Sequence, residues 1–181
     1  MLKEMVFAGF GGQGVLSMGT LIAYAAMKEG KEVSWFPSYG PEMRGGTANC
    51  MVNVSDEDIS SPIDTEFDIA AVFNIPSLEK FEPRVKKGGI LIWESSVIKK
   101  GPTRKDIHSY AVPAIRIATD KLKNIKVMNM VAMGALLKIT QIVKKESVFN
   151  ALKGTLPERY HHLLPLNKKA LDMGMDMIKT K

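Results

Sequence analysis

The feature that most constrains the fold is a glycine-rich turn between a short apolar run and an amphipathic segment. Residues 5–8 are apolar, and residues 9–14 spell Gly-Phe-Gly-Gly-Gln-Gly. Apolar side chains then recur at helical spacing over residues 15–27. A Gly-x-Gly-x-x-Gly between a strand and a helix lets the backbone approach a phosphate at the helix N-terminus. The sequence therefore predicts a strand, a turn and a helix that open an α/β domain.

The next two strands predict a mixed sheet. Residues 33–36 follow the helix as a second strand, which a crossover connection places parallel to the first. Residues 47–55 alternate in polarity, as a third strand with one buried face does. The connection over residues 37–46 is too short and too rich in glycine and proline for a crossover helix, so the third strand is expected to run antiparallel to the second.

The remaining pattern alternates strand and helix and then becomes helical. Strands are predicted at 68–73, 90–93 and 107–112, a turn at 87–89, a short helical passage at 77–84, a helix with Pro113 in its first position, and helices at 131–142, 147–152 and 167–178. We therefore expect an α/β fold: a Rossmann-like three-layer domain with a mixed, mostly parallel sheet and a helical C-terminal region. With 181 residues and 45% apolar content, residues 1–181 are interpreted as a single domain.

Composition excludes several classes of protein. Cys50 is the only cysteine, so the chain forms no internal disulfide and holds no four-thiolate iron–sulfur cluster. The net charge of +6 comes from basic residues spread along the sequence, without the basic and aromatic motifs of an RNA-binding sheet. No signal core or bilayer-length apolar stretch is present. The sequence thus predicts a cytoplasmic protein that binds neither nucleic acid nor membrane.

The glycine-rich turn first suggests a dinucleotide, but the second strand lacks the residue that NAD requires. A Rossmann site for NAD places Asp or Glu at the end of that strand to bind the ribose hydroxyls, whereas this strand ends in Trp35-Phe36-Pro37. A free-standing NAD(P)-binding Rossmann oxidoreductase therefore remains only as an alternative. Two other interpretations stay open: a general site for a phosphate or cofactor tail, and glycines that merely permit close packing of helix on strand.

The segment after the second strand is predicted to lie beside the glycine-rich turn, because parallel strands place their carboxyl ends at one edge of the sheet. Residues 38–46 combine Tyr, Glu, Met and Arg with glycines, which is typical of a binding or docking loop. Arg44 is suited to hold a phosphate, a carboxylate or a partner's acidic side chain. A solvated turn with no ligand is the alternative.

Other candidate sites are weaker. His161-His162 lacks a third ligand at metal spacing, so no metal site is predicted. Asp68, Glu94 and Asp120 lack the partner arrangement of acid and base catalysts, and no catalytic residue is assigned to this chain.

Two motifs together resemble the gamma subunit of 2-oxoacid:ferredoxin oxidoreductases: residues 8–15 (Ala-Gly-Phe-Gly-Gly-Gln-Gly-Val) and residues 37–50 (Pro-Ser-Tyr-Gly-Pro-Glu-Met-Arg-Gly-Gly-Thr-Ala-Asn-Cys). The similarity continues through residues 85–89, 112–114 and 129–135, so it spans nearly the whole chain. The Ser-Tyr-Gly-Pro-Glu form of the second motif resembles 2-oxoglutarate and branched-chain 2-oxoacid enzymes more than pyruvate enzymes.

The resemblance implies a subunit of a complex that converts a 2-oxoacid and CoA to acyl-CoA and CO2 and reduces ferredoxin. Family members use thiamine diphosphate with magnesium and [4Fe–4S] clusters. This chain has neither the cysteines for a cluster nor a Gly-Asp-Gly…Asn motif for the magnesium of thiamine diphosphate, so those cofactors are expected on other chains. The implied partners are alpha and beta subunits, with a ferredoxin-like delta subunit as a further candidate, and ferredoxin as acceptor.

The resemblance also assigns roles to residues. It implies CoA contacts from Gly9, Gly11, Gly12, Gln13, Gly14 and Arg44. It implies an interface or docking loop made of Ser38, Tyr39, Gly40, Pro41, Glu42, Met43, Gly45 and Gly46. CoA presents a pyrophosphate to a glycine turn without requiring an acid on the second strand. A purely architectural interaction module is the remaining alternative.

Overall fold

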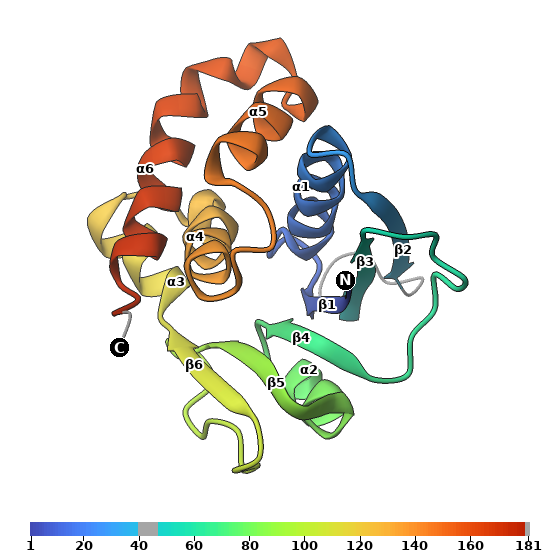
Figure 1. The fold of residues 1–181 in the computed structure, drawn as a ribbon. Coiled ribbons are helices and arrows are strands. Elements are labelled where there is room, and N and C mark those ends of the chain that lie inside the picture. Colours follow the sequence, from blue (N-terminus) through green and yellow to red (C-terminus); the bar gives the residue numbers. More distant parts are fainter. Residues whose placement is uncertain (40–46, 180–181) are drawn as a thin grey trace.

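The computed structural model describes residues 1–39 and 47–179 and has one six-stranded sheet at its centre (Figure 1). The strand order is β2-β3-β1-β4-β5-β6. The strands are β1 (Leu2–Phe10), β2 (Glu32–Tyr39), β3 (Thr47–Ser55), β4 (Phe67–Val72), β5 (Val85–Glu94) and β6 (His108–Val112).

The sheet is mixed because, of the strands described, β3 runs against all the others. β3 pairs antiparallel with both β1 and β2. The pairs β1–β4, β4–β5 and β5–β6 are parallel. β2 therefore has the same direction as β1, as predicted, although β3 lies between them. The predicted antiparallel third strand and the mixed, mostly parallel sheet are confirmed.

Helices cover both faces of the sheet. They are α1 (Val15–Lys28), α2 (Ile75–Phe81), α3 (Ala114–Arg116), α4 (Met128–Thr140), α5 (Lys145–Thr155) and α6 (Leu164–Asp176), with shorter 3-10 or π turns at Glu82–Arg84, Ile117–Lys121, Ile125–Val127 and Glu158–Leu163. Figure 1 shows α1, α4, α5 and α6 on one side of the sheet and α2 on the other. The three-layer arrangement and the helical C-terminal region are thus confirmed.

Several local predictions were wrong in detail. β2 extends over Glu32–Tyr39 rather than residues 33–36, because β3 pairs with it along its whole length. β1 extends over Leu2–Phe10 rather than residues 5–8, because β3 pairs with it along its whole length. The turn predicted at residues 87–89 lies inside β5, where Gly88 has φ +75° and the pairing with β4 shifts register, as in a β-bulge. Pro113 is the N-cap residue of α3 and not its first helical residue.

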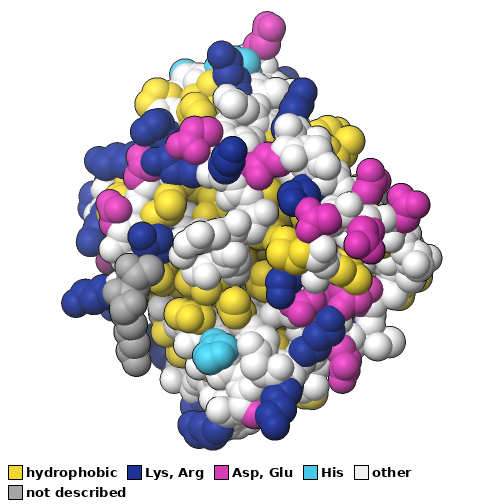
Figure 2. Space-filling model, in the orientation of Figure 1, with side chains coloured by type: hydrophobic (Ala, Val, Ile, Leu, Met, Phe, Trp, Pro, Cys, Tyr) yellow, Lys and Arg dark blue, Asp and Glu magenta, His cyan; other side chains and the backbone are white. Residues whose placement is uncertain are grey.

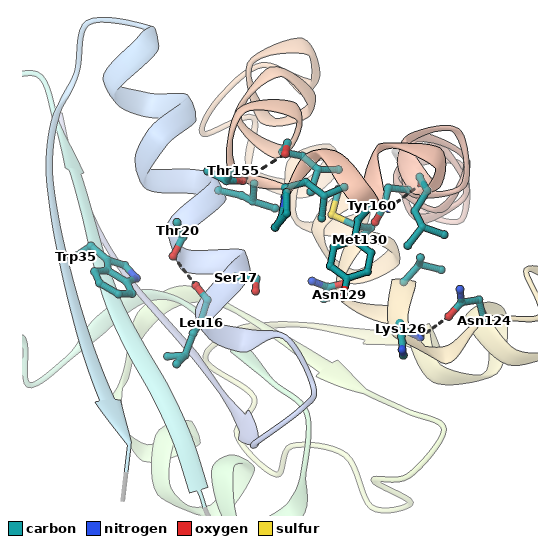
Figure 3. Close-up of a pocket in the computed structure, with 17 residues that line it drawn as sticks. Leu16, Ser17, Thr20, Trp35, Asn124, Lys126, Asn129, Met130, Thr155 and Tyr160 are labelled. Carbon is teal, nitrogen blue, oxygen red and sulfur yellow. Dashed lines mark hydrogen bonds between the residues drawn. The ribbon is translucent and has the colours of Figure 1, made fainter. Parts of the chain in front are cut away.

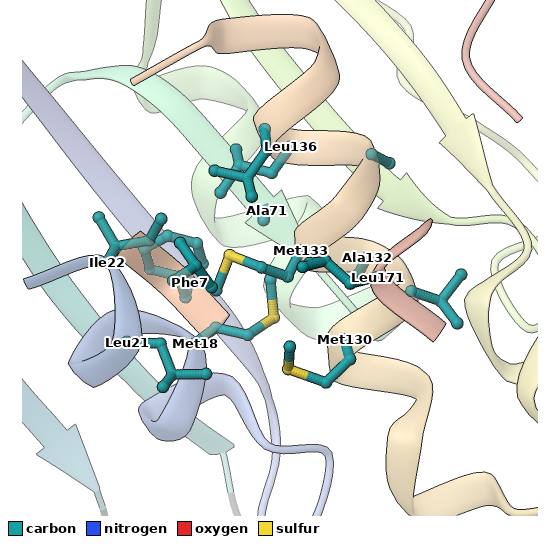
Figure 4. Close-up of a cluster of buried hydrophobic side chains, with 14 of the residues drawn as sticks. Phe7, Met18, Leu21, Ile22, Ala71, Met130, Ala132, Met133, Leu136 and Leu171 are labelled. Carbon is teal, nitrogen blue, oxygen red and sulfur yellow. The ribbon is translucent and has the colours of Figure 1, made fainter. Parts of the chain in front are cut away.

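The larger part of the core lies between the sheet and α1, α4 and α6, and methionines fill much of it. Met18 from α1 and Met130 and Met133 from α4 are fully or almost fully buried between Phe7 of β1 and Leu171 of α6 (Figure 4). Unbranched thioether side chains adapt to irregular gaps between helices. The alternating residues Ala48, Cys50, Val52 and Val54 of β3 face this core, as their spacing predicts.

The smaller part of the core lies under α2. Phe67 of β4 and Phe81 of α2 meet edge to face, with ring centroids 5.9 Å apart. The Arg84 guanidinium lies over both rings and donates to the carbonyl oxygens of Asp64 and Thr65. This side chain therefore fixes the end of the α2 segment to the chain that enters β4.

Two glycines allow α4 and α6 to pack against each other. A Cβ on Gly134 of α4 would overlap the carbonyl oxygen of Leu171, and a Cβ on Gly174 of α6 would overlap that of Val131. Each glycine thus admits the backbone of the facing helix.

A search of the described helices for one with the length and hydropathy of a membrane span finds none.

Replacing Gly174 by alanine is expected to lower the free energy of unfolding by about 2–3 kcal/mol, because the added methyl group forces α4 and α6 apart. Urea unfolding followed by circular dichroism measures this. Gly154→Ala on α5 is the matched control, since a Cβ there meets no atom within 4 Å, and it should stabilise slightly. Equal destabilisation by both substitutions would contradict the packing argument.

Candidate functional site

The glycine-rich turn lies where the strand order of the sheet reverses. The chain leaves β1 through α1 toward β2 and β3 on one side, and it then continues into β4 on the other side of β1. In open α/β sheets, ligands bind in the crevice outside the carboxyl ends of the strands at this switch point. Residues 11–14, which follow β1, stand at that edge.

Gln13 holds the turn in shape through both ends of its amide. Its Oε1 accepts a hydrogen bond from the Phe10 amide at 2.7 Å, and its Nε2 donates to the Phe73 carbonyl at 3.2 Å. The Phe73 amide in turn donates to the Ala8 carbonyl at 2.9 Å. The side chain therefore ties the turn after β1 to the end of β4, a positioning role that the motif alone does not reveal.

The glycines of the turn have different reasons to be glycine. A Cβ on Gly9 would lie 2.5 Å from the Gln13 amide oxygen, and a Cβ on Gly14 would lie 2.7 Å from Nδ2 of Asn129 on α4. Gly12 has φ +93°, and a Cβ there would meet nothing within 4 Å. Packing accounts for Gly9, and packing together with φ +76° accounts for Gly14, whereas Gly12 is a left-handed residue whose Cβ position faces open space.

The N-terminus of α1 opens onto a shallow cavity of about 350 Å³. Its lining consists of Phe10, Gly11, Gly12, Gly14, Val15, Leu16, Ser17 and Ala48. The N-cap residue of α1, Gly14, makes no side-chain cap, and no acidic residue lies in the first turn. The partial positive charge of the helix end is thus not offset by a carboxylate, which favours an anion in this cavity.

The second motif is only partly within the described residues. Gly40, Pro41, Glu42, Met43, Arg44, Gly45 and Gly46 lie outside them. Ser38 is exposed near the end of β2, Tyr39 pairs with Ala48, and Thr47 pairs with Phe10 at the entrance of the glycine-rich turn. The described ends of the two motifs therefore meet at one edge of the sheet, while the predicted position of the loop itself falls on residues outside the described ones.

A larger groove adjoins the shallow cavity and shares Leu16 and Ser17 with it. We call it the side groove; it runs between α1, Trp35 of β2, the chain that enters α4 and the segment from the end of α5 to α6, and has a volume of about 580 Å³ (Figure 3). Four separate parts of the chain build it, so no single sequence motif indicates it.

Two of the three acidic residues considered as catalysts have structural partners, and the third, Asp120, is exposed. Asp68 accepts from the Glu4 amide at 2.9 Å and pairs with Lys86 at 3.2 Å. Glu94 is only 1% exposed and accepts from the Ser96 amide at 2.6 Å and the Ile115 amide at 2.9 Å. Both carboxylates therefore join segments of the fold. Within residues 1–39 and 47–179, no three His, Cys, Asp or Glu side chains are grouped so that they could hold a metal ion.

The two adjacent histidines, His161 and His162, contact backbone carbonyl groups of nearby residues. His161 contacts the Leu156 carbonyl through Nε2 at 2.8 Å, and His162 contacts the Arg159 carbonyl through Nδ1 at 3.0 Å. Both lie in the 3-10 segment Glu158–Leu163, with His162 exposed. These contacts stabilise the connection between α5 and α6.

Cys50 is unsuited to nucleophilic chemistry. Its side chain is completely buried under α1, and burial raises the pKa of the thiol to about 12. The sulfur lies 3.4 Å from the Val15 carbonyl oxygen. A thiol that stays protonated and inaccessible is a packing element rather than a reactive group.

Charge is unevenly distributed over the molecular surface. Figure 2 shows Lys and Arg side chains along the margin over α3 and α6, while Asp and Glu side chains gather on the opposite side, over β2 and the segment after β3. Apolar side chains lie between the two regions. The α3 and α6 side of this face therefore favours an anionic ligand or partner over a cationic one.

Together, these features define a Rossmann-like α/β domain with an uncapped helix N-terminus at its switch point. The sequence profile described as Pyruvate ferredoxin/flavodoxin oxidoreductase matches residues 4–177. The chain belongs to this family, and the predicted resemblance to its gamma subunits is confirmed.

Two relatives illustrate the range of the similarity. The ketoisovalerate oxidoreductase subunit VorA of Methanothermobacter marburgensis is 38% identical over 93% of this chain, and the match covers 35% of VorA. The 2-oxoglutarate synthase subunit KorC of Methanocaldococcus jannaschii is 34% identical, over 87% of this chain and 86% of KorC. The chain thus spans about a third of the length of VorA and most of the length of KorC.

Solved structures agree with this assignment. The gamma subunit of keto/oxoacid ferredoxin oxidoreductase from Geobacter sulfurreducens superposes with a TM-score of 0.81 at 31% identity, over 96% of each chain. The 2-oxoglutarate:ferredoxin oxidoreductase from Magnetococcus marinus, with 2-oxoglutarate, coenzyme A and succinyl-CoA bound, gives 0.89 at 25% identity, over 99% of this chain and 32% of that one. The same domain therefore occurs both as a separate chain and as part of a longer one.

Cys50 is expected to react with Ellman's reagent at pH 8 on the order of 1,000-fold more slowly than a free thiol, because burial keeps it protonated. Guanidinium unfolding should restore the normal rate. Since the folded-state pKa lies above the unfolded value, this thiol also makes the fold lose stability as the pH rises above about 8.5. Rapid labelling of the folded protein would disprove the assignment.

Proposed function

We propose that this chain is the gamma subunit of a multi-subunit 2-oxoacid:ferredoxin oxidoreductase that acts with CoA and reduces ferredoxin. The family match over residues 4–177 and the superposition on the CoA-bound enzyme of Magnetococcus marinus support the proposal. The single observation that carries it is the uncapped N-terminus of α1, which opens at the switch point beside the start of β3.

In the proposed reaction, different chains of the complex supply different chemical steps. The bond between the carboxylate carbon and the keto carbon breaks to release CO2, the keto carbon forms a thioester with CoA, the thiol proton is released, and the electrons pass to ferredoxin. Thiamine diphosphate with magnesium and [4Fe–4S] clusters supply the decarboxylation and the electron transfer. A single cysteine does not ligate a four-thiolate cluster, and the sequence has no Gly-Asp-Gly…Asn motif for the magnesium of thiamine diphosphate. In the proposal, partner alpha and beta subunits hold these groups, with a ferredoxin-like delta subunit as a further candidate.

This chain contributes a surface for CoA. In the proposal, the pyrophosphate lies at the N-terminus of α1, where Gly12 admits a close approach of the backbone. Gly9, Gly11 and Gly14 shape the turn and Gln13 positions it. Arg44 supplies the balancing positive charge from the second motif, and the rest of that motif, Ser38 to Gly46, docks against a neighbouring subunit.

The proposed 2-oxoacid is 2-oxoglutarate. The KorC relative, which matches along most of its length, is named as a 2-oxoglutarate synthase subunit. The Magnetococcus marinus enzyme is a 2-oxoglutarate:ferredoxin oxidoreductase. VorA is named as a ketoisovalerate oxidoreductase subunit, so a branched-chain 2-oxoacid is the second candidate.

Gly12→Ala and Arg44→Ala are each expected to weaken CoA binding to the assembled complex by about tenfold or more, because the first adds a methyl group at a left-handed position that the phosphate approaches and the second removes the guanidinium that pairs with it. Isothermal titration of CoA into the complex, purified through a tag on this chain, measures the affinity. Gly30→Ala is the matched control: Gly30 has φ +77° and open space around its Cβ position, but lies at the other end of α1. Unchanged affinity for CoA in both test variants would contradict the proposed CoA site.

The same complex is expected to show its highest kcat/KM with 2-oxoglutarate when pyruvate, 2-oxoisovalerate and 2-oxoglutarate are compared, with ferredoxin reduction as the readout. A difference of at least about 100-fold over pyruvate is expected, since a pocket built to pair the distal carboxylate leaves its charged partner unpaired with a shorter substrate. Preference for pyruvate would overturn the substrate proposal and leave the subunit assignment intact.

A further inference from the structure

We propose that Glu4 and Asp64 form a carboxyl pair that shares one proton and holds the segment between β3 and β4 against the sheet, so that a rise in pH releases the segment. This connecting segment, residues 56–66, follows β3 and leads into β4. Both residues of the carboxyl pair lie near the starts of the parallel strands β1 and β4, at the edge of the sheet opposite the glycine-rich turn. The carboxyl pair is therefore separate from the proposed CoA site.

Asp64 is the side chain that the connecting segment buries. Of residues 56–66, Asp64 alone is buried, at 8% exposed, whereas its apolar neighbour Ile63 is 56% exposed. A segment held by packing alone would be expected to turn the isoleucine inward and the carboxyl group outward, because burial of an unpaired charge is costly. The buried anchor of this segment is thus a titratable group rather than an apolar one.

A row of polar side chains lies beneath Asp64, on the face of the sheet that α2 covers. Glu4 of β1 is paired with Asn53 of β3, which is paired in turn with Ser34 of β2. Directly paired residues point to the same face of a sheet. That face is the one under α2, because Val6, two residues after Glu4, belongs to the core there. The Asp64 carboxyl lies against both Glu4 and Asn53, so the connecting segment meets the sheet at these side chains.

Buried oxygen atoms at this contact lack a hydrogen-bond donor. Oδ2 of Asp64, Oδ1 of Asn53 and Oγ of Ser34 are buried and form no hydrogen bond with the described residues. The Asn53 amide nitrogen is directed to the Ser61 carbonyl oxygen, to which it donates at 3.2 Å. Buried acceptors are almost always paired, since an unpaired one loses its hydration without compensation. A proton on Asp64 Oδ2 supplies a donor at this contact, and the facing Glu4 carboxylate accepts it.

The surrounding ion pairs make Glu4 the charged member of the carboxyl pair. The Lys86 ammonium pairs with the Glu4 carboxylate and, at 3.2 Å, with Asp68. Lys3 lies 3.9 Å from Asp68. None of the ion pairs among residues 1–39 and 47–179 includes Asp64. Three carboxyl groups therefore face two ammonium groups, and a proton on Asp64 balances the charge.

Burial raises the pKa of Asp64, and the adjacent Glu4 carboxylate raises it further, while Asn53 and Lys86 offset part of the increase. Arg84 also faces Asp64, but its guanidinium donates to the backbone carbonyl oxygen at 2.8 Å. Because the folded-state pKa lies above the unfolded value of about 3.9, the shared proton contributes its full stabilisation below that pH. The contribution is lost as the pH rises through the folded-state pKa, because two adjacent carboxylates then repel each other.

Hydrogen exchange of residues 56–66 in the full-length protein, compared between wild type and Asp64→Asn, tests the proposal. Asparagine keeps the shape of the side chain and supplies a donor at every pH. At about pH 5 the two proteins should exchange at similar rates in this segment. At about pH 9 the wild-type segment should exchange about tenfold faster than the variant, which is the factor that one pKa unit represents. A wild-type segment that exchanges no faster than the variant at the higher pH overturns the proposal.

Asp58→Asn is the matched control, because Asp58 lies in the same segment but is exposed. This variant should exchange as wild type does at both pH values. Carboxyl-carbon NMR of the wild-type protein measures the pKa of Asp64 without any substitution: a midpoint above about 3.9 is expected, and a midpoint at or below it overturns the proposal. Protection restored at the higher pH by Ca²⁺ or Mg²⁺ would also overturn it, since a cation rather than a proton would then join the two carboxyl groups.

Discussion

The pairing of β3 with both β1 and β2 is the constraint on which the rest of the structure depends. In the commonest doubly wound order, the second strand lies directly beside the first. Here β3 occupies that place, and its nine residues pair with β1 from Leu2 to Phe10. Because β3 runs antiparallel, its first residue, Thr47, lies opposite the last residue of β1. The chain that leaves β2 is thereby brought back to the entrance of the glycine-rich turn, and two distant motifs share one edge.

This insertion explains why a dinucleotide-like motif appears without a dinucleotide-like second strand. An acid at the end of the second strand can bind a ribose only where that strand borders the site, and β3 separates β2 from β1. The turn itself is kept in a fixed shape from the other side, since the Gln13 amide bridges Phe10 and Phe73. Gly14 then carries the chain into α1 with its Cα against Asn129. The helix N-terminus is therefore positioned by β4 and α4 rather than by β2.

Local signals predicted the strands, the first helix and the orientation of β3, because each depends on residue spacing and turn composition. They did not predict where β3 lies in the sheet, since strand order depends on tertiary pairing that periodicity does not encode. Nor did they show that both ends of the Gln13 amide form hydrogen bonds within the chain, that Asn129 lies against Gly14, or that Lys126 lines a groove. Those contacts join residues that are about 60 to 115 positions apart in the chain. The glycine-rich turn was recognisable in the sequence because one short segment carries its chemistry. The side groove was not recognisable, because its lining comes from four separate segments.

The distribution of chemistry over the fold argues for a surface that functions in an assembly. The buried carboxylate of Glu94 caps backbone amides, Asp68 pairs with Lys86, and the single thiol is sealed beneath α1. What remains available is a helix N-terminus, an open left-handed glycine, a lysine without a carboxylate partner among the described residues, and a groove. Under the proposed function, these groups bind and orient CoA, and the transfer of protons and electrons belongs to other subunits. A domain of this kind occurs within longer chains of the family, where it covers about a third of the length. Under the proposed function, its contribution is to hold CoA at the edge of a site whose reacting groups belong to other subunits.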